Sequence, residues 1–315
     1  MPNTILTLTL NPSVDISYPL NHLDLNTVNR VSKIQKTAGG KGLNVARVIA
    51  QLGQKVAGSG FLGGDLGNFI AKKLHGDNIE NWFMQISGET RNCIAILHDG
   101  GKQTEILESG PEITEKEAAE FIAHLEKYMD KIDLMTVSGS LPKGLPTDFY
   151  SKLIEIADKH EVQTLLDSSG EPLLKSLSNI HRPYLIKPNQ DEIEQIAGKK
   201  INDLDQLKTI LLETPLLASI PWVVVSLGKD GAIAKVGMNL FYAKIPKIEA
   251  VNPVGSGDST VAGLACALNR NADVEDVLKT AMTAGILNTL NQKTGCIDIS
   301  LFDRYYSQIV IEKIN

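Results

Sequence analysis

Asn252–Gly263 reads NPVGSGDSTVAG, and the rest of the chain is interpreted outward from this stretch. It contains the helix breaker Pro253, continues through three small residues at 255–257, and then presents a single carboxylate, Asp258. Small apolar residues follow as far as Leu268. This order predicts a glycine-rich turn that opens a buried helix.

The turn can be interpreted in two ways. Free backbone N–H groups at a helix start form a cradle for an anion, and the helix dipole adds partial positive charge there. Asp258 would lie beside such an anion and could take a proton from a hydroxyl that attacks a phosphate. Alternatively, Gly255 and Gly257 make a tight turn and Asp258 caps the helix. The stretch alone leaves both interpretations open.

Length and composition are those of a globular enzyme rather than of a disordered or fibrous protein. The chain has 315 residues, of which 43% are hydrophobic and 22% charged, and this length allows a sizeable core. The net charge of −6, without a block of like charges, argues against a nucleic-acid partner. An anionic small substrate stays compatible with that charge, because a few local Arg or Lys residues suffice to bind it.

No pattern predicts export or membrane insertion. The N-terminal MPNTILTLTL has no basic region and predicts a strand, and no apolar run approaches the ~20 residues that a membrane helix needs. The three cysteines, Cys93, Cys266 and Cys296, are scattered without metal-type spacing, which is typical of a reducing compartment. We therefore expect a cytoplasmic protein with no membrane partner.

Strand and helix patterns alternate through most of the chain. Short β-prone runs occur at 5–10, 134–138, 162–166, 184–186 and 222–226, with helical patterns between most of them. Such alternation predicts an α/β fold with a parallel sheet covered on both faces. No repeat, low-complexity stretch or linker divides the chain, so 1–315 is expected to form a single domain.

Two helix-poor segments fit this sheet poorly. They span about 12–37 and 91–110, and the second contains two β-prone runs joined by Asp99-Gly100-Gly101, a hairpin signal. We expect both segments to project together as a small β lid.

Two further local patterns concern helix starts. Thr114 and Glu117 have capping-box spacing before a helix expected at 118–129. Gly58–Gly63, GSGFLG, matches a dinucleotide fingerprint, but no acidic residue clearly ends a second strand about 20 positions on. We interpret GSGFLG as a glycine-rich strand-to-helix connection rather than as a cofactor site.

Polar residues gather directly after the predicted strands, where ligands of parallel sheets bind. The usual nucleotide motifs are absent, because none of the four Gly-Lys pairs is followed by Ser or Thr as a Walker A motif requires. No protein-kinase or Ser-hydrolase motif occurs, and the six histidines are isolated. Phosphate chemistry would therefore need another arrangement of residues.

NPVGSGDSTVAG together with AGGKGLNVA at 38–46 resembles the two signature stretches of the ribokinase-like (PfkB) sugar kinases. KPNQDE at 187–192 resembles that family's Asn-x-x-Glu element, and VSGSLPKG and VVSLGKDGA also resemble family segments, so the resemblance runs nearly end to end. It implies a ribokinase-like three-layer sandwich with a mostly parallel central sheet, a small β lid, and an ATP- and Mg²⁺-dependent kinase.

The resemblance also implies roles for single residues. Asp258 would be the catalytic base for the sugar's C1 hydroxyl, with the backbone of Gly255, Ser256 and Gly257 as anion hole. Asn189 and Glu192 would hold Mg²⁺, through water. The nucleotide would contact Lys187, Asn189, Ser226 and Gly228. The sugar hydroxyls would be bound by Asp15, Gly40, Asn44 and Ser140, with Lys41 beside them.

Two arginines indicate the substrate class. Arg30 and Arg91 in the lid segments would grip a phosphate already on the substrate, which a kinase for a free sugar does not need. The alternative is that both are solvated lid residues. Val28 departs from the pattern, because related phosphofructokinases can carry a lysine there, so the grip would use fewer charges.

Within the family, LTLNPSVDISYPL and TEILESGPE look most like the enzymes that phosphorylate tagatose 6-phosphate to tagatose 1,6-bisphosphate in lactose and galactose breakdown. The 1-phosphofructokinases and 6-phosphofructokinases of the same family are the alternatives. A non-catalytic sugar-phosphate-binding protein is a remote one, because Asp258, the anion hole and Asn189 with Glu192 are all present. Members of the family often pair through their lids, so the resemblance implies a homodimer.

Overall fold

The first strand explains why the central sheet is buried on both faces. The computed structural model describes residues 4–315, and β1 (Thr4–Thr9) is buried at every position. Ile5 packs into one hydrophobic core, whereas Leu6 and Leu8 pack into the other. Because side chains alternate across a strand, one short run of sequence serves two cores.

The central sheet is mostly parallel. Strand β1 is the third strand from the β5 edge and pairs in parallel with β9 and β4, while the last three strands at the other edge pair antiparallel. Within residues 4–315 the order is β15 (Val310–Lys313), β14 (Asn239–Lys244), β13 (Ala232–Val236), β12 (Trp222–Ser226), β11 (Leu185–Ile186), β10 (Gln163–Asp167), β9 (Ile132–Ser138), β1, β4 (Val56–Gly63) and β5 (Glu80–Asn81), with β6 (Met84–Ile86) also on β4.

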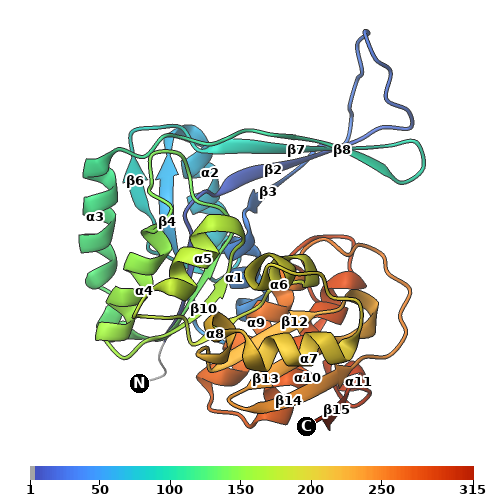
Figure 1. Cartoon of the computed structure of the whole chain (residues 1–315). Coiled ribbons are helices and arrows are strands. Elements are labelled where there is room, and N and C mark those ends of the chain that lie inside the picture. Colours follow the sequence, from blue (N-terminus) through green and yellow to red (C-terminus); the bar gives the residue numbers. More distant parts are fainter. Residues whose placement is uncertain (1–3) are drawn as a thin grey trace.

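Helices cover both faces of this sheet, so the predicted three-layer α/β fold is confirmed (Figure 1). One layer holds α1 (Lys41–Gln51), α2 (Gly64–Gly76), α9 (Ser256–Asn269) and α10 (Val274–Thr289), with α11 (Phe302–Tyr306) against α10. The other holds α3 (Glu115–Glu126), α4 (Phe149–Lys159), α5 (Gly170–Ser178), α6 (Gln190–Ala197), α7 (Leu204–Glu213) and α8 (Pro215–Ala218). Short 3₁₀ turns lie at Met129–Lys131, Gly228–Asp230 and Ile299–Leu301. Within residues 4–315, none of these helices is long and apolar enough to cross a bilayer.

A second, smaller sheet projects from one end of the body (Figure 1). Its order is β3 (Gln35–Gly39), β2 (Ser13–Pro19), β7 (Arg91–His98) and β8 (Lys102–Leu107). The segment between β2 and β3, residues 20–34, extends away from the body beyond this sheet. We refer to these four strands as the small sheet.

One sequence interpretation was wrong. GSGFLG at 58–63 is not a strand-to-helix connection but most of strand β4 itself, and the helix begins only at Gly64. The glycines serve close packing inside the sheet: a Cβ on Gly60 would lie 2.0 Å from the carbonyl oxygen of Thr9, and one on Gly58 would lie 3.0 Å from Phe83. The neighbours of the strand, rather than a ligand, therefore account for these two glycines.

The capping box that the sequence predicts is present at α3. Thr114 Oγ1 accepts from the N–H of Glu117, and the Glu117 carboxylate accepts from the N–H of Thr114. The other carboxylate oxygen accepts from both the N–H and the hydroxyl of Ser87 at 2.9 Å. These hydrogen bonds, led by those from the two backbone N–H groups, lower the pKa of Glu117 to about 2.

We predict that Glu117→Gln lowers the free energy of unfolding by about 1–3 kcal/mol at pH 7, because the amide NH₂ would face donors and leave hydrogen bonds unmade. The folded-state pKa of Glu117 lies below its usual 4.5, so its stabilisation is present above that pH and is lost as the pH falls towards 2. Urea unfolding of both proteins should therefore show a difference that narrows below pH 4.5.

Glu120→Gln is the matched control on the same helix. Glu120 is exposed and pairs with Lys116, 3.7 Å away, so its loss should change the free energy of unfolding by less than about 0.5 kcal/mol. Equal effects of the two substitutions would contradict the assignment of stability to the Glu117 hydrogen bonds.

Candidate active site

The glycine-rich turn opens α9 in the way that an anion cradle requires. Gly255 is the residue before the helix and has a positive φ of 82°, and a Cβ there would lie 2.5 Å from the Thr294 methyl group. Within the described residues 4–315, no side chain caps the first turn of α9. Residues 255–257 are only half-buried. The N–H of Ser256 donates to the carbonyl of Pro253 at 3.2 Å, whereas the N–H groups of Gly255 and Gly257 have no hydrogen-bond partner within residues 4–315 and remain available to a ligand.

Asp258 does not cap α9, so the alternative interpretation of the glycine-rich turn is wrong on this point. It lies in the first turn of α9, is only 7% exposed, and its Oδ2 accepts a hydrogen bond of 2.8 Å from Nδ2 of Asn44. Asn44 belongs to the first turn of α1, 214 residues away in the chain. The two glycine-containing stretches therefore meet through one side-chain hydrogen bond.

The surroundings of Asp258 adapt it to proton transfer. Burial raises the pKa of Asp258 to about 6, and the nearby negative charge of Asp167 acts in the same direction. The hydrogen bond from Asn44 and the charges of Lys41 and Lys187 limit this rise. A carboxylate with a pKa close to the working pH is ionised at neutral pH and still basic enough to accept a proton.

Asp167 is a central site residue to which the sequence reasoning assigned no role. It ends β10, its side chain is 5% exposed, and it lies 3.4 Å from the Lys187 ammonium and 3.7 Å from the Lys41 ammonium. Its charge raises the pKa of Lys41. Its place at the carboxyl end of a parallel strand is the signal that could have identified it.

Lys187 lies beside the glycine-rich turn. A Cβ on Gly257 would lie 3.4 Å from its Nζ, and the side chain is 7% exposed. Negative charge bound at this place would be stabilised both by the buried ammonium group of Lys187 and by the free N–H groups at the start of α9. This is the geometry that a transferring phosphoryl group requires.

The Asn189 and Glu192 pair forms a capping box at the start of α6. Asn189 Oδ1 accepts from the N–H of Glu192, and Glu192 Oε2 accepts from the N–H of Asn189, both at 2.9 Å. Burial raises the pKa of Glu192, and Asp167, Lys187 and Lys41 are close enough to affect it. Hard carboxylate oxygens of this kind suit Mg²⁺ bound through water.

The remaining residues predicted to border a nucleotide follow β12. Ser226 forms an isolated parallel β-bridge with Asn189, and the N–H of Ser226 donates to the carbonyl of Pro188. Gly228 is exposed two residues later and has a φ of 59°. The structure therefore brings Ser226 next to the Asn189 turn and leaves Gly228 at an open rim.

The residues predicted to bind sugar hydroxyls lie around the start of α1. Asp15 Oδ1 accepts a 2.6 Å hydrogen bond from Ser13, and a Cβ on Gly39 would lie only 2.0 Å from that carboxylate oxygen. Burial raises the pKa of Asp15. Gly40, with a φ of 109°, directly precedes α1, while exposed Ser140 follows β9.

The two arginines behave differently. Arg91 donates from Nη1 to the carbonyl of Glu108 and from Nη2 to that of Asn11, and its buried Nε has no partner within residues 4–315. The charge of Arg91 also acts on Asp15, so the two lie near each other. Arg30 is exposed and belongs to segment 20–34, which extends away from the body (Figure 1).

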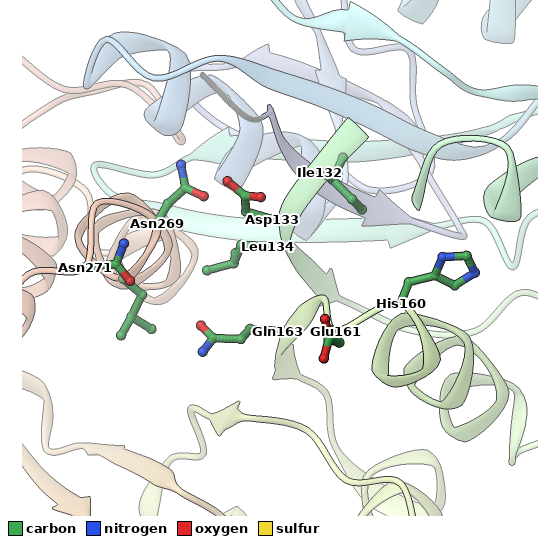
Figure 2. A pocket seen from close by; sticks show the side chains of 9 residues that line it. Ile132, Asp133, Leu134, His160, Glu161, Gln163, Asn269 and Asn271 are labelled. Carbon is green, nitrogen blue, oxygen red and sulfur yellow. The ribbon is translucent and has the colours of Figure 1, made fainter. Parts of the chain in front are cut away.

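The structure also contains a cavity of about 470 Å³, and Figure 2 shows the side chains that line it. It opens at the amino ends of β9 and β10 and beside Asn269, the last residue of α9. Because a helix rises 1.5 Å per residue, Asn269 and Asp258 are about 16 Å apart along α9. This cavity is therefore separate from the site around Asp258.

Comparison with known proteins gives the family. The family model described as "pfkB family carbohydrate kinase" matches residues 8–300. The chain belongs to the PfkB family of carbohydrate kinases. It is 50% identical, over 98% of its own length and 100% of the relative's, to the tagatose-6-phosphate kinase of Staphylococcus epidermidis.

Solved structures agree with the fold of this PfkB kinase. Phosphofructokinase-2 from Escherichia coli in complex with fructose-6-phosphate superposes with a TM-score of 0.87 at 27% identity, covering 97% of this chain and 98% of that one. The tetrameric inhibited form of the same enzyme superposes with a TM-score of 0.86 at 27% identity, with the same coverage. The expectation of a ribokinase-like fold is confirmed.

For this carbohydrate kinase we predict that Asp258 titrates near pH 6 in metal-free buffer, because burial and the charge of Asp167 both disfavour its ionised form. In Asp167→Asn one of these causes is gone, so the pKa of Asp258 should fall. Carbon-13 NMR of labelled aspartate carboxyl groups measures both values, and the spectrum of Asp258→Asn assigns the resonance. An Asp258 that titrates near 4 in the unmodified protein would contradict the prediction.

Proposed function

We propose that this protein transfers the γ-phosphoryl group of ATP to the C1 hydroxyl of tagatose 6-phosphate, giving tagatose 1,6-bisphosphate. The observation that carries the proposal is the 50% identity, over nearly the whole of both chains, to a tagatose-6-phosphate kinase. We further propose that the enzyme works in the cytoplasm, in lactose and galactose breakdown. The buried Asp258 beside an uncapped helix start supports the transfer chemistry.

In the proposed mechanism, Asp258 accepts the proton of the C1 hydroxyl as the hydroxyl oxygen attacks the γ-phosphorus and ADP leaves. The N–H groups at 255–257 stabilise the charge on the transferring group, and the Lys187 ammonium beside Gly257 adds to that stabilisation. Asn44 holds the Asp258 carboxylate through its 2.8 Å hydrogen bond. The enzyme then has to release a proton from Asp258 before the next turnover.

The proposed Mg²⁺ site fits the residues present. Glu192 is a half-buried carboxylate whose pKa Asp167 helps to raise, so two acidic side chains lie close together. We propose that Glu192 and Asn189 hold the ion through water and that Ser226 and Gly228 border the nucleotide. When bound, Mg²⁺ would neutralise phosphate charge, while Lys41 and Lys187 remain held by Asp167.

We propose that Arg91 grips the substrate's own phosphate. Its Nη groups are fixed by backbone carbonyls, and its buried Nε lacks an acceptor that a phosphate oxygen could supply. Its charge acts on Asp15, which we propose binds sugar hydroxyls with Gly40, Asn44, Lys41 and Ser140. Arg30 would join only from another position of segment 20–34 or from a second copy of the chain.

Fructose 6-phosphate and fructose 1-phosphate are the competing acceptors. The E. coli structure that superposes with a TM-score of 0.87 holds fructose-6-phosphate, and tagatose differs from fructose only in the configuration at C4. Discrimination between two such sugars depends on placing one hydrogen-bonding group. The same Asp258 chemistry would serve all three substrates.

The test is steady-state kinetics with ATP and Mg²⁺ against the three sugar phosphates. We expect the highest kcat/KM for tagatose 6-phosphate, with fructose 6-phosphate lower by roughly ten- to a hundredfold. A lead for fructose 1-phosphate would overturn the substrate assignment and leave the transfer chemistry standing. Asp258→Asn should reduce kcat by about 10²- to 10⁴-fold while ATP binding persists. Near-normal turnover by that variant would refute the role of Asp258.

We propose that 1–315 form one kinase domain in which the small sheet, from about 12–37 and 91–110, acts as a lid. We also propose that two copies pair through it. Exposed Leu97 and Leu107 carry this proposal: they lie on the same face as Asp15, because Cys93 pairs with both Asp15 and Leu107.

Sedimentation velocity tests the proposed pairing. The unmodified protein should sediment as a dimer, and Leu97→Glu with Leu107→Glu should yield monomers, because charges would be buried in the interface. Val310→Glu is the matched control, since Val310 is also exposed and apolar but lies in β15 at the far edge of the central sheet. Dissociation by the control alone would move the interface away from the small sheet.

A further inference from the structure

Arg47 makes an unusual contact with the residue that holds the proposed base. It lies on α1, three positions after Asn44, so both side chains share one face of the helix. Its Nη2 donates to Asn44 Oδ1 at 2.5 Å, and its Nη1 donates to the carbonyl of Ala38 at 2.6 Å. Arg47, Asn44 and Asp258 therefore form a continuous hydrogen-bonded chain.

The chemistry of this chain allows only one direction. An Asn side chain carries an acceptor oxygen and a donor NH₂ group, which exchange places when the amide turns over. Arginine is a donor only, so the group that faces Arg47 must be the oxygen of Asn44. The NH₂ group then points at Asp258. In the reversed orientation, the Asn44 oxygen would face a carboxylate oxygen of Asp258, and the Asn44 NH₂ group would face the donor of Arg47.

The surroundings hold the Arg47 guanidinium in place. A Cβ on Gly295 would lie 3.1 Å both from Nη2 of Arg47 and from Cα of Asn44, so the 291–297 segment closes over them. Gln51 ties this segment to α1, because its Nε2 donates to the carbonyl of Gly295 and its Oε1 accepts from the N–H of Ile297. The planar guanidinium of Arg47 donates to two acceptors, the Ala38 carbonyl and Asn44 Oδ1, and these two hydrogen bonds fix its orientation.

We propose that Arg47 is a positioning residue: it fixes the amide of Asn44 so that this amide donates to Asp258 and aims the carboxylate at the substrate hydroxyl. The inference rests on the proposed function, in which Asp258 is the base. Arg47 itself touches neither substrate nor phosphate in this scheme. Its effect reaches the reaction through Asn44.

The titration of Asp258 is the most direct readout. The charged groups around it are Asp167, Lys41 and Lys187, with Arg47 beyond Asn44, and all but Arg47 stay unchanged in the test. In Arg47→Met the oxygen of the Asn44 amide loses the partner that fixes it, so the NH₂ group is held less firmly against the ionised carboxylate. We expect the pKa of Asp258 to rise by about one unit, which is a tenfold change in the proton-binding equilibrium.

A double substitution separates orientation from the charge of Arg47. If Arg47 acts through Asn44, then Arg47→Met added to Asn44→Ala shifts the carbon-13 titration of Asp258 no further than Asn44→Ala alone. An equal shift in both backgrounds, or no shift in the single variant, would overturn the proposal. The side-chain NH₂ resonance of Asn44 in the unmodified protein gives a second measurement: it should follow the titration of Asp258, and a resonance insensitive to it would also overturn the proposal.

Gln51→Ala is the matched structural control. It removes the ties between α1 and the 291–297 segment but leaves the Asn44 amide between its two partners. It should lower the melting temperature without moving the titration of Asp258, and a shift as large as that of Arg47→Met would mean that any loosening of α1 has this effect.

Kinetics distinguish failure of this inference from failure of the proposed function. If Asp258→Asn is inactive and Arg47→Met leaves the titration unmoved, only the role of Arg47 fails. If Asp258→Asn keeps its turnover, the base assignment fails whatever Arg47 does. With both roles correct, the acid limb of the kcat profile of Arg47→Met moves upward by about one pH unit, and the KM for ATP stays the same.

Discussion

The hydrogen bond between Asn44 and Asp258 is the constraint on which the rest of the site depends. It joins the first turns of α1 and α9, which come from opposite ends of the chain and pack side by side. Gly42 allows α1 to approach the sheet, because a Cβ there would lie 2.3 Å from Thr9 Oγ1. When both helix starts are fixed in this way, the carboxylate, the uncapped N–H groups and the sugar-binding turn share one edge of the sheet.

Charge balance is the second requirement of this edge. Asp167 and Asp258 are both buried carboxylates, and two buried charges of one sign are costly unless they are paired. Lys187 and Lys41 supply the compensation, and Asp167 lies between them at 3.4 and 3.7 Å. The ends of β10 and β11 and the starts of α1 and α9 must therefore meet at the same place before any of these side chains is stable there. Both the stability of the buried carboxylates and the binding of a phosphate require the two lysines at this edge of the sheet.

Local patterns predicted most elements because their causes are local. Three kinds of element depend on neighbours within a few positions: the Thr114–Glu117 capping box, the buried strands, and the helix after the glycine-rich turn. GSGFLG was misinterpreted because its glycines are required by close contacts with Thr9 and Phe83, which are far away in the chain. Asp167 received no role for the same reason: its two lysine partners lie 126 and 20 residues away, so no local spacing reveals them.

By itself, the sequence determined the α/β class, most helix and strand positions, the family resemblance and the residues of the glycine-rich turn, because these follow from periodicity and contiguous motifs. Only the tertiary structure decided that Asp258 receives a hydrogen bond from Asn44 rather than capping α9, and that the segment holding Arg30 extends away from the body. It also decided how Arg47 orients the Asn44 amide. The physical reason is that hydrogen bonds between distant segments, and the burial that shifts a pKa, exist only after the layers have packed.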